Sequence, residues 1–186
     1  PDLVAKQIKV VANAGGVNPL ACKDAVLEVM ARAGVRGIKV AVVEGDDIFG
    51  RLDELAAAGE ELRNMDTGEP LASVLDRVVS ANAYLGARPV AEALAGGAQI
   101  VLCGRVTDTA LALGPLVHEH GWAADDWDRL AAGTIAGHIL ECGAQATGGN
   151  FSRFWEVPEL WNVGYPIAEV AADGSFVVIK HPGTGG

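Results

Sequence analysis

Short apolar runs that alternate with helical segments are the feature that most limits the fold of this chain. Four such runs predict strands, at residues 8–12, 38–43, 78–83 and 100–103. Each is followed by a polar loop and then by apolar residues at helical spacing. Strand–helix alternation of this kind predicts a parallel sheet with right-handed crossovers and helices on both faces. We therefore expect an α/β protein, Rossmann-like, with a mostly parallel sheet flanked by helices.

Local signals place the helices. Asn18 before Pro19 is typical of an N-cap followed by the first helical position, and Gly34 is placed to end that helix. Gly96 and Gly97 stop a later helix. The predicted helices span residues 19–34, 48–58, 71–76, 89–95, 108–120 and 125–147.

The pattern changes near residue 150. Residues 167–171 and 176–180, joined by an Asp-Gly turn, predict a β-hairpin. We expect residues 1–150 to form the α/β domain core, and residues 151–186 to be an aromatic-rich connection and a hairpin that begins a further region. The aromatic side chains of this part are expected to pack in the core rather than to line a pocket or a subunit contact. They are Phe151, Phe154, Trp155, Trp161 and Tyr165.

Charge and cysteine content limit the partners and the compartment. The 186 residues include 14 Lys and Arg against 24 Asp and Glu, a formal charge of −10, which disfavours nucleic acid as the main ligand. Three scattered cysteines predict neither a disulfide framework nor a zinc knuckle, and favour a reducing, cytoplasmic setting. No apolar run approaches the roughly 20 residues that span a bilayer, and no signal-peptide pattern is present, so we expect no membrane partner. Because Pro1 is not methionine and the chain stops in a glycine-rich loop, we expect it to be a piece of a longer protein.

Polar residues gather in the four loops that follow the predicted strands. Ligands of open parallel sheets bind beyond the carboxyl ends of the strands, so these loops predict one composite site for a small anionic molecule. Neither nucleotide fingerprint, GxGxxG or GxxxxGK[ST], is present in the first loop. The ligand-binding candidates in the four loops are Asn13, Gly15, Gly16, Asn18, Glu44, Asp46, Asn82, Arg105, Thr107 and Asp108.

Each loop also has a plainer interpretation. Gly15 and Gly16 could present backbone N–H groups to an anion at a helix N-terminus, or could simply form a tight turn. Glu44 and Asp46, with Asp47 beside them, could bind a divalent cation or supply a general base. We favour the alternative in which Asp47 caps a helix and its neighbours are solvated.

The fourth loop is the more specific one. Arg105 could hold a carboxylate or phosphate through two hydrogen bonds. The alternative, which is compatible with the first, is that Asp108 pairs with Arg105. Either Thr107 or Asp108 is expected to cap the following helix.

The helix at residues 125–147 carries the catalytic candidates. His138, Glu141, Cys142 and Gln145 fall at i, i+3, i+4 and i+7, which places them on one stripe. A histidine and a cysteine could act as base and nucleophile. His138 and Glu141 could instead ligate a metal, although two ligands make no site. The third alternative is a structural histidine and a buried cysteine that fills apolar space, so the cofactor and metal content stays open.

Two glycine-rich loops complete the set of candidates. They follow the helix and end the chain, and each is either a loop that closes over a ligand or an ordinary turn. Their ligand-binding candidates, with Gln145 on the preceding helix, are Thr147, Gly148, Asn150, Lys180, His181 and Thr184.

Seven ordered segments resemble the acyclic terpene utilisation protein A family. They are residues 11–19, 44–47, 66–70, 81–86, 104–108, 141–150 and 180–186. Members of that family are longer, so the chain corresponds to the central part of the domain. The resemblance implies bacterial-type catabolism of acyclic terpenoids such as citronellol and geraniol through acyl-coenzyme A intermediates. It supplies no catalytic residues.

Together these observations favour a cytoplasmic, homo-oligomeric enzyme that acts on an acyl-coenzyme A or a related anionic intermediate. The anion would be held by the loops at residues 13–18 and 104–108, and the reaction would be hydration, hydrolysis or carbon–carbon cleavage. The alternative is a non-catalytic assembly or carrier-binding subunit of the same pathway.

Overall fold

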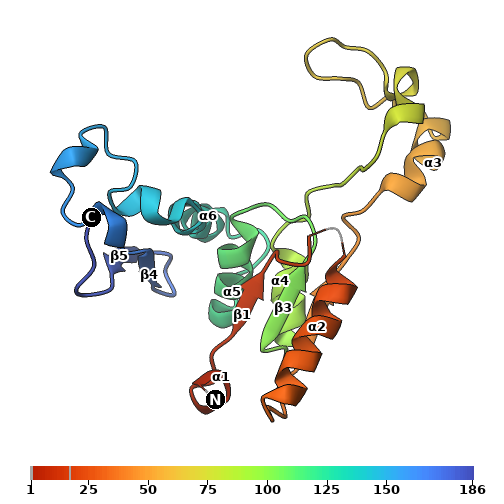
Figure 1. The fold of residues 1–186 in the computed structure, drawn as a ribbon. Coiled ribbons are helices and arrows are strands. Elements are labelled where there is room, and N and C mark those ends of the chain that lie inside the picture. The colour runs from red at the N-terminus through yellow and green to blue at the C-terminus, as the bar shows by residue number, and fades with distance from the viewer. Residues whose placement is uncertain (1, 17) are drawn as a thin grey trace.

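The structure, a computed structural model, describes residues 2–16 and 18–186 (Figure 1). Pro1 and Val17, which belong to the N-terminal end and to the first loop, lie outside the described residues. The α-helices are α1 (Asp2–Ala5), α2 (Pro19–Arg32), α3 (Leu52–Ala57), α4 (Arg88–Ala95), α5 (Ala110–His120) and α6 (Trp127–Cys142). The strands are β1 (Val10–Ala12), β2 (Val40–Val43), β3 (Ile100–Cys103), β4 (Pro166–Val170) and β5 (Phe176–Lys180). Short 3₁₀ helices occur at Phe49–Arg51, Leu71–Ser73, Leu75–Arg77, Gly143–Thr147, Phe154–Glu156 and Leu160–Asn162.

The predicted parallel sheet flanked by helices is confirmed. Its order is β1-β3-β2, and Val10 and Val40 both lie opposite Ile100. The connection from β1 to β2 passes across β3 with α2, and the connection from β2 back to β3 runs in the opposite direction with α4. Because both crossovers are expected to be right-handed, the two helices belong on opposite faces of the sheet.

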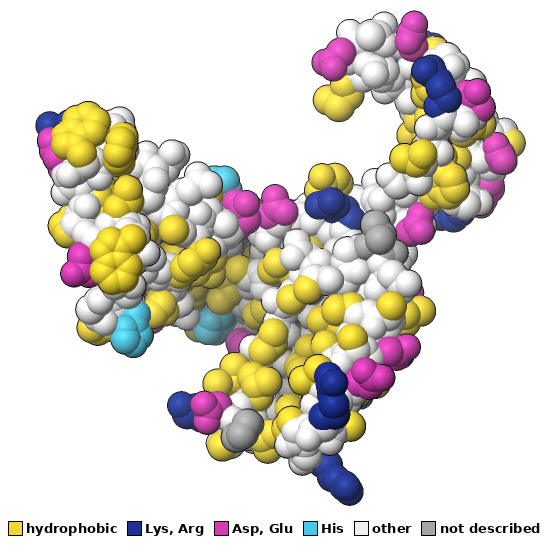
Figure 2. All heavy atoms as spheres, viewed as in Figure 1, with side chains coloured by type: hydrophobic (Ala, Val, Ile, Leu, Met, Phe, Trp, Pro, Cys, Tyr) yellow, Lys and Arg dark blue, Asp and Glu magenta, His cyan; other side chains and the backbone are white. Residues whose placement is uncertain are grey.

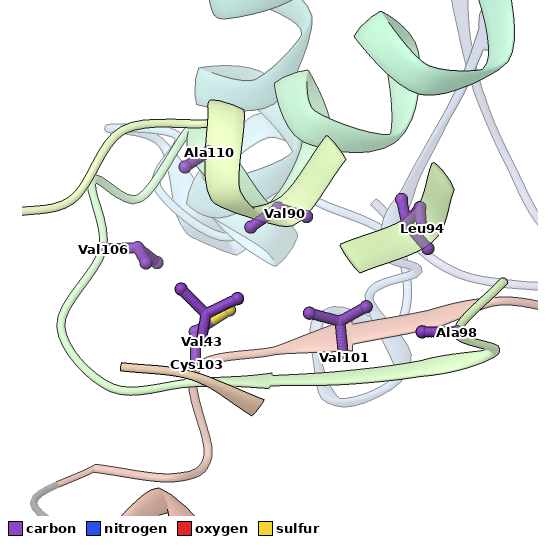
Figure 3. Packing of buried hydrophobic residues seen from close by; sticks show 8 residues of the cluster. All are labelled: Val43, Val90, Leu94, Ala98, Val101, Cys103, Val106 and Ala110. Atoms are coloured by element: carbon purple, nitrogen blue, oxygen red, sulfur yellow. The ribbon is translucent and has the colours of Figure 1, made fainter. Parts of the chain in front are cut away.

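The central strand β3 is buried on both faces. Val101 and Cys103 are fully buried and point toward Val90 and Leu94 of α4 (Figure 3). Side chains alternate along a strand, so Ile100 and Leu102 point to the other face, where α2 packs. Each fully buried aliphatic side chain stabilises the fold by about 1.5–3 kcal/mol, which makes β3 the part that fixes the position of the neighbouring loops.

Several local signals acted as expected. The Asn18 side chain accepts a hydrogen bond from the Ala21 N–H at 3.0 Å, and Pro19 is the first residue of α2. Gly34 has φ of +66° directly after that helix, a conformation that few other residues adopt without strain. These two residues fix where α2 begins and ends.

The strand predicted at residues 78–83 is wrong. The segment makes one isolated bridge, between Asn82 and Asp47, and Val79 is 91% exposed. Its apolar residues suggested a buried strand, but the segment pairs with a loop rather than with the sheet. The chain therefore contributes three strands, rather than four, to the parallel sheet within the described residues.

Helix boundaries differ from the prediction in four places. Helix α5 begins at Ala110 after Thr109, without a side-chain cap, so the predicted cap at Thr107 or Asp108 is wrong. Helix α6 ends at Cys142, because Gly143 has φ of +55° and the chain continues as a 3₁₀ turn. The helix predicted at residues 48–58 is shorter, and that predicted at 71–76 is two 3₁₀ turns.

The predicted hairpin is confirmed as β4 and β5, and β4 packs on α6. The Trp122 indole N–H, from the loop after α5, donates to the Ala172 carbonyl at 2.9 Å and ties the hairpin turn to the helices. The division of the chain at residue 150 stays a prediction.

The aromatic residues between α6 and the hairpin are exposed, so their expected core role is wrong. Exposed fractions run from 45% for Phe151 to 84% for Trp161. Large apolar side chains gather at the end of the molecule formed by the C-terminal residues, as Figure 2 shows. Among the residues described, no helix has the length and apolar character that a bilayer crossing requires.

Candidate functional site

The buried carboxylate of Asp46 joins three loops at the carboxyl edge of the sheet. Asp46 follows β2, is 4% exposed, and accepts hydrogen bonds at Oδ2 from the backbone N–H of Arg105 at 2.7 Å and from Asn82 Nδ2 at 3.0 Å. The Asp46 carbonyl also accepts the N–H of Ala83 at 2.7 Å. A buried carboxylate with two donors is stabilised where an unpaired one would be costly. The loops after β2 and β3 and the segment around Asn82 are therefore held as one unit.

Two glycines permit this close approach. A Cβ on Gly104 would lie 2.3 Å from Asp46 Oδ1, and a Cβ on Gly15 would lie 2.7 Å from the Cys103 carbonyl oxygen. Both distances are shorter than any non-bonded contact that a carbon atom tolerates. Gly15 thus packs the first loop against β3, which agrees with the tight-turn interpretation, and its ligand-binding role stays a prediction.

The Asp46 charge also affects its neighbour in β3. Burial, with the nearby Asp46 carboxylate, raises the pKa of the Cys103 thiol to about 11. The thiol is fully buried, so it stays protonated and packs as an apolar group.

The first hollow at this edge is acidic, and we call it the acidic hollow. It has a volume of about 510 Å³. Its walls come from the loop before α2, the loop after β2 and the segment at residues 79–82. The lining residues are Gly16, Asn18, Pro19, Leu20, Glu44, Gly45, Asp46, Asp47, Phe49, Val79, Ser80 and Asn82. Five of the predicted binding residues therefore share one hollow, but its three carboxylates repel the anion that the sequence led us to expect.

Asp47 has a structural role at the acidic hollow. Its Oδ1 accepts the N–H of Phe49 at 2.9 Å, at the start of the 3₁₀ helix. This contact and the exposure of Glu44 agree with the interpretation in which Asp47 begins a helical segment. The expected solvation of its neighbours is wrong for Asp46, which is buried and accepts hydrogen bonds from Arg105 and Asn82.

Arg105 presents a cation beside the same edge. Its backbone is fixed by Asp46, whereas its exposed guanidinium lies over the Tyr84 ring with Cζ 5.3 Å from the ring centre. Over residues 2–16 and 18–186 no ion pair joins it to Asp108, so the pairing that we considered is absent. The stacked guanidinium keeps its N–H donors for an external anion.

A second hollow lies where α5, α6 and β4 meet the loop after β1, and we call it the α5–α6 hollow. Its volume is about 560 Å³, and it combines an apolar wall with polar groups from three elements. The lining residues are Asn13, Asp108, Leu111, Ala112, Pro115, Leu116, Gly137, Leu140, Glu141, Ala168 and Val170. Figure 2 shows apolar side chains in the recess between the sheet and the C-terminal part.

The apolar wall of this hollow was not predicted, although the sequence contains a helical pattern that indicates it. Asp108, Leu111, Ala112, Pro115 and Leu116 recur at the spacing of one helix face. A polar residue at the head of an apolar helical face could therefore have indicated a pocket. The contribution of β4 could not be found this way, because it depends on how the hairpin folds back.

The three catalytic candidates are close together near the end of α6. Cys142 Sγ lies 4.0 Å from His138 Nε2 and 3.7 Å from Glu141 Oε2. His138 and Glu141 are exposed and Cys142 is half-buried. Partial burial, together with the Glu141 carboxylate, raises the pKa of the Cys142 thiol. A thiol with a raised pKa is a poor nucleophile by itself, so the base-and-nucleophile interpretation has no electrostatic support here.

The α6 cluster reaches the α5–α6 hollow through one residue. Glu141 lines the hollow together with Gly137 and Leu140, whereas His138 and Cys142 are not among the lining residues. Gln145, in the following 3₁₀ turn, is exposed.

The remaining candidates lie in the C-terminal part, where several of them donate hydrogen bonds to backbone carbonyls. Thr147 donates to the Gly164 carbonyl, Lys180 donates to the Gly185 carbonyl at 2.5 Å, and Thr184 donates to the His181 carbonyl at 2.7 Å. Within the described chain, none of these residues lines either hollow, and neither do the nearby Gly148 and Asn150. Their contacts hold the final loop in place, and a ligand-binding role for them stays a prediction.

Comparison with known proteins assigns the chain. The model of the family described as "Acyclic terpene utilisation family protein AtuA" matches residues 1–186. The chain belongs to this family. No curated protein and no solved structure matches the chain. Membership in the AtuA family supports a role in acyclic terpene utilisation and confirms the resemblance found in the sequence.

The carboxyl edge of the parallel sheet is built from segments that carry the AtuA resemblance. Residues 11–19, 44–47, 81–86 and 104–108 come from separate parts of the chain, and hydrogen bonds or packing around Asp46 and Gly15 bring them together. In this AtuA protein the carboxyl edge of the parallel sheet is therefore the candidate site, with the two hollows on either side of it.

Proposed function

We propose that this chain acts on an acyl-coenzyme A or a related anionic intermediate of acyclic terpenoid catabolism. The α5–α6 hollow holds the hydrocarbon chain, and Arg105 binds the anionic part. Glu141 and Asp108 supply proton transfer for hydration, hydrolysis or carbon–carbon cleavage. The setting is cytoplasmic.

The observation that carries this proposal is the composition of the α5–α6 hollow. Leu111, Leu116 and Leu140 provide apolar wall, while Asn13, Asp108 and Glu141 bring polar groups to it. Ligand pockets typically combine an apolar lining with a few polar groups that fix orientation. A branched terpenoid chain with one oxygen function has the matching chemistry.

Charge assigns the anion to Arg105 rather than to the loop at residues 13–18. That loop faces the acidic hollow, where three carboxylates repel a phosphate or carboxylate. Arg105 stands on the neighbouring loop, stacked on Tyr84 and without an ion-pair partner in the described structure. Its loop also contributes Asp108 to the α5–α6 hollow, so the two parts of one ligand are held by one loop.

Calorimetric binding of geranyl- and citronellyl-coenzyme A tests the proposal. Arg105→Ala is expected to weaken binding about 10- to 100-fold, the loss of one charged hydrogen-bonding group. Arg36→Ala is the matched control, because Arg36 is an exposed arginine before β2, at the opposite edge of the sheet. Undiminished affinity in the Arg105 variant would reject the anchoring role.

A second pair of variants tests the hollow. Leu140→Gln places an amide in the apolar wall and is expected to weaken binding of both acyl-coenzyme A compounds. Ile135→Gln, on the same helix at a position that is 57% exposed, is expected to leave binding unchanged. Equal effects of the two substitutions on binding would show that the α5–α6 hollow does not hold the hydrocarbon chain.

A large exposed surface that includes aromatic side chains favours a second candidate, a homo-oligomeric assembly or carrier-binding subunit without catalysis. The described chain exposes 11752 Å², whereas a compact monomer of 19.2 kDa exposes about 8,400 Å². The difference exceeds the roughly 800 Å² per partner that a standard interface covers. Trp155 and Trp161, 69% and 84% exposed, are typical interface residues.

Sedimentation and turnover separate the two candidates. An oligomer that dissociates on Trp161→Ser substitution, together with no turnover of any acyl-coenzyme A, would favour assembly. Turnover that depends on Glu141 would favour the enzyme. A protein that stays monomeric at all concentrations would rule out the homo-oligomeric assembly.

A further inference from the structure

Three potential metal ligands lie on the last turns of α6. His138, Glu141 and Cys142 each offer one ligand atom, and these atoms all lie within 4.8 Å of one another. The sequence suggested a two-ligand pair, and the structure adds the cysteine as a third member. Their positions at i, i+3 and i+4 bring them together on one face of a rigid helix, so the cluster depends on no loop.

The distances agree with a tetrahedral zinc site. With bonds of about 2.3 Å to sulfur and about 2.1 Å to nitrogen or oxygen, the sulfur of such a site lies about 3.6 Å from each of the other two ligand atoms. Cys142 Sγ lies 4.0 Å from His138 Nε2 and 3.7 Å from Glu141 Oε2. Both sulfur distances are within a few tenths of an ångström of the zinc values, and the ligand atoms of His138 and Glu141 lie within 4.8 Å of each other.

The ligand types select the metal. Thiolate and imidazole favour zinc and related transition metals, whereas Mg²⁺ and Ca²⁺ take oxygen ligands. Three protein ligands from one helix leave the fourth position of a tetrahedral ion open, as in catalytic zinc sites. Closed structural sites use four protein ligands, so the arrangement differs from a purely structural one.

We propose that His138, Glu141 and Cys142 bind one Zn²⁺ ion whose open position faces the α5–α6 hollow. Glu141 belongs both to the ligand set and to the lining of the hollow, so the ion lies at the border of that hollow. Its role rests on the proposed function: at the open position the ion holds a water molecule or the carbonyl oxygen of the acyl group, and with Glu141 bound to the ion proton transfer falls to Asp108 of the same hollow. Metal binding itself does not depend on that function.

Cobalt titration of the metal-depleted protein tests the site. Co²⁺ replaces Zn²⁺ in tetrahedral sites and absorbs visible light, and a bound thiolate adds a charge-transfer band. We expect one Co²⁺ per chain, displaced by Zn²⁺, with the thiolate band present. His138→Ala and Glu141→Gln are expected to weaken binding at least about tenfold, and Cys142→Ser is expected to abolish the thiolate band.

Matched controls come from the same protein. Cys22→Ser on α2 and His118→Ala on α5 remove a half-buried cysteine and a half-buried histidine outside the cluster, and both are expected to retain binding and spectrum. No cobalt binding, or a thiolate band that survives Cys142→Ser, would overturn the proposal. So would loss of the band in Cys22→Ser.

A measurement on the unsubstituted protein keeps the result independent of variant folding. Zn²⁺ is expected to protect Cys142, but not Cys22, from alkylation as read by peptide mass spectrometry. Equal alkylation of Cys142 with and without Zn²⁺ would contradict the site. Acyl-coenzyme A binding is measured separately, so zinc binding without ligand binding would reject the proposed function and leave the metal site standing.

Discussion

Replacing Gly104 with alanine should break the junction of the three loops. The new Cβ would lie 2.3 Å from Oδ1, 2.6 Å from Oδ2 and 2.7 Å from Cγ of Asp46, so the carboxylate cannot stay where it is. Its displacement breaks the hydrogen bonds with the Arg105 backbone and with Asn82. Because each buried group that loses its partner costs about 1–3 kcal/mol, we expect Gly104→Ala to lower the free energy of unfolding by about 3–5 kcal/mol.

The size of this effect should depend on the Asp46 side chain. Asp46→Ala removes the same hydrogen bonds and is expected to cost about 2–4 kcal/mol, since the exposed Asn82 amide can turn to water. In the double variant the Cβ at position 104 no longer meets a carboxylate. We therefore expect the double variant to be about as stable as Asp46→Ala alone, which gives a coupling energy of about 3–5 kcal/mol between the two sites.

Urea denaturation followed by circular dichroism measures all three variants. Gly86→Ala is the control, because a Cβ there meets nothing within 4 Å and the residue has no positive φ. Additive losses in the double variant would refute the steric reasoning. So would a Gly104→Ala variant that is as stable as the control.

Three further predictions concern other parts of the fold. Asn18→Ala should lower the free energy of unfolding by about 1 kcal/mol, because it removes the N-cap of α2; urea denaturation measures this loss, and an unchanged midpoint would contradict it. The pKa of the Cys103 thiol is raised to about 11 from an ordinary value of 9.0, so the protonated thiol favours the folded state. This contribution to the free energy of unfolding is complete below about pH 9 and is lost as the pH rises toward 11. The free energy of unfolding should therefore fall across that window, and Cys103→Ala should show a shallower fall. Trp122→Phe should lose about 1 kcal/mol with the hydrogen bond to Ala172 and speed amide exchange in the hairpin turn, and unchanged exchange would mean that this bond does not hold the hairpin.

Local sequence was sufficient where a residue acts on its own neighbours. The cap at Asn18 and the turn of the hairpin depend on contacts within a few residues, and both could be predicted. The residues that form β3 are apolar because the strand is covered on both faces, so its bounds could be predicted too. The convergence of the loops followed from topology, since the carboxyl ends of parallel strands meet at one edge.

Pairing over a distance could not be predicted in this way. Residues 78–83 have the composition of a strand, but their partner is the loop at Asp47, and composition does not specify a partner. The aromatic residues near Trp161 were expected inside because they are apolar, although burial also requires an element to cover them. The α5–α6 hollow needs the hairpin against α6, which is again a contact between distant segments.

The distribution of charge at the sheet edge limits how an anionic ligand can bind. Glu44, Asp46 and Asp47 line one hollow, and Asp108 and Glu141 line the other, while the Arg105 guanidinium lies over Tyr84. Two like charges 4 Å apart repel by about 4 kcal/mol at the surface of a protein, and at physiological ionic strength screening acts over about 8 Å. An anion inside either hollow would meet carboxylates within that range, so the phosphates of a coenzyme A group are favoured only outside both, near Arg105. A Zn²⁺ ion on the α6 cluster would offset the charge of Glu141 and make the α5–α6 hollow the one that accepts a polar carbonyl. The direction of the proposed ligand, with phosphates outward and the terpenoid chain inward, therefore follows from electrostatics as well as from the apolar wall.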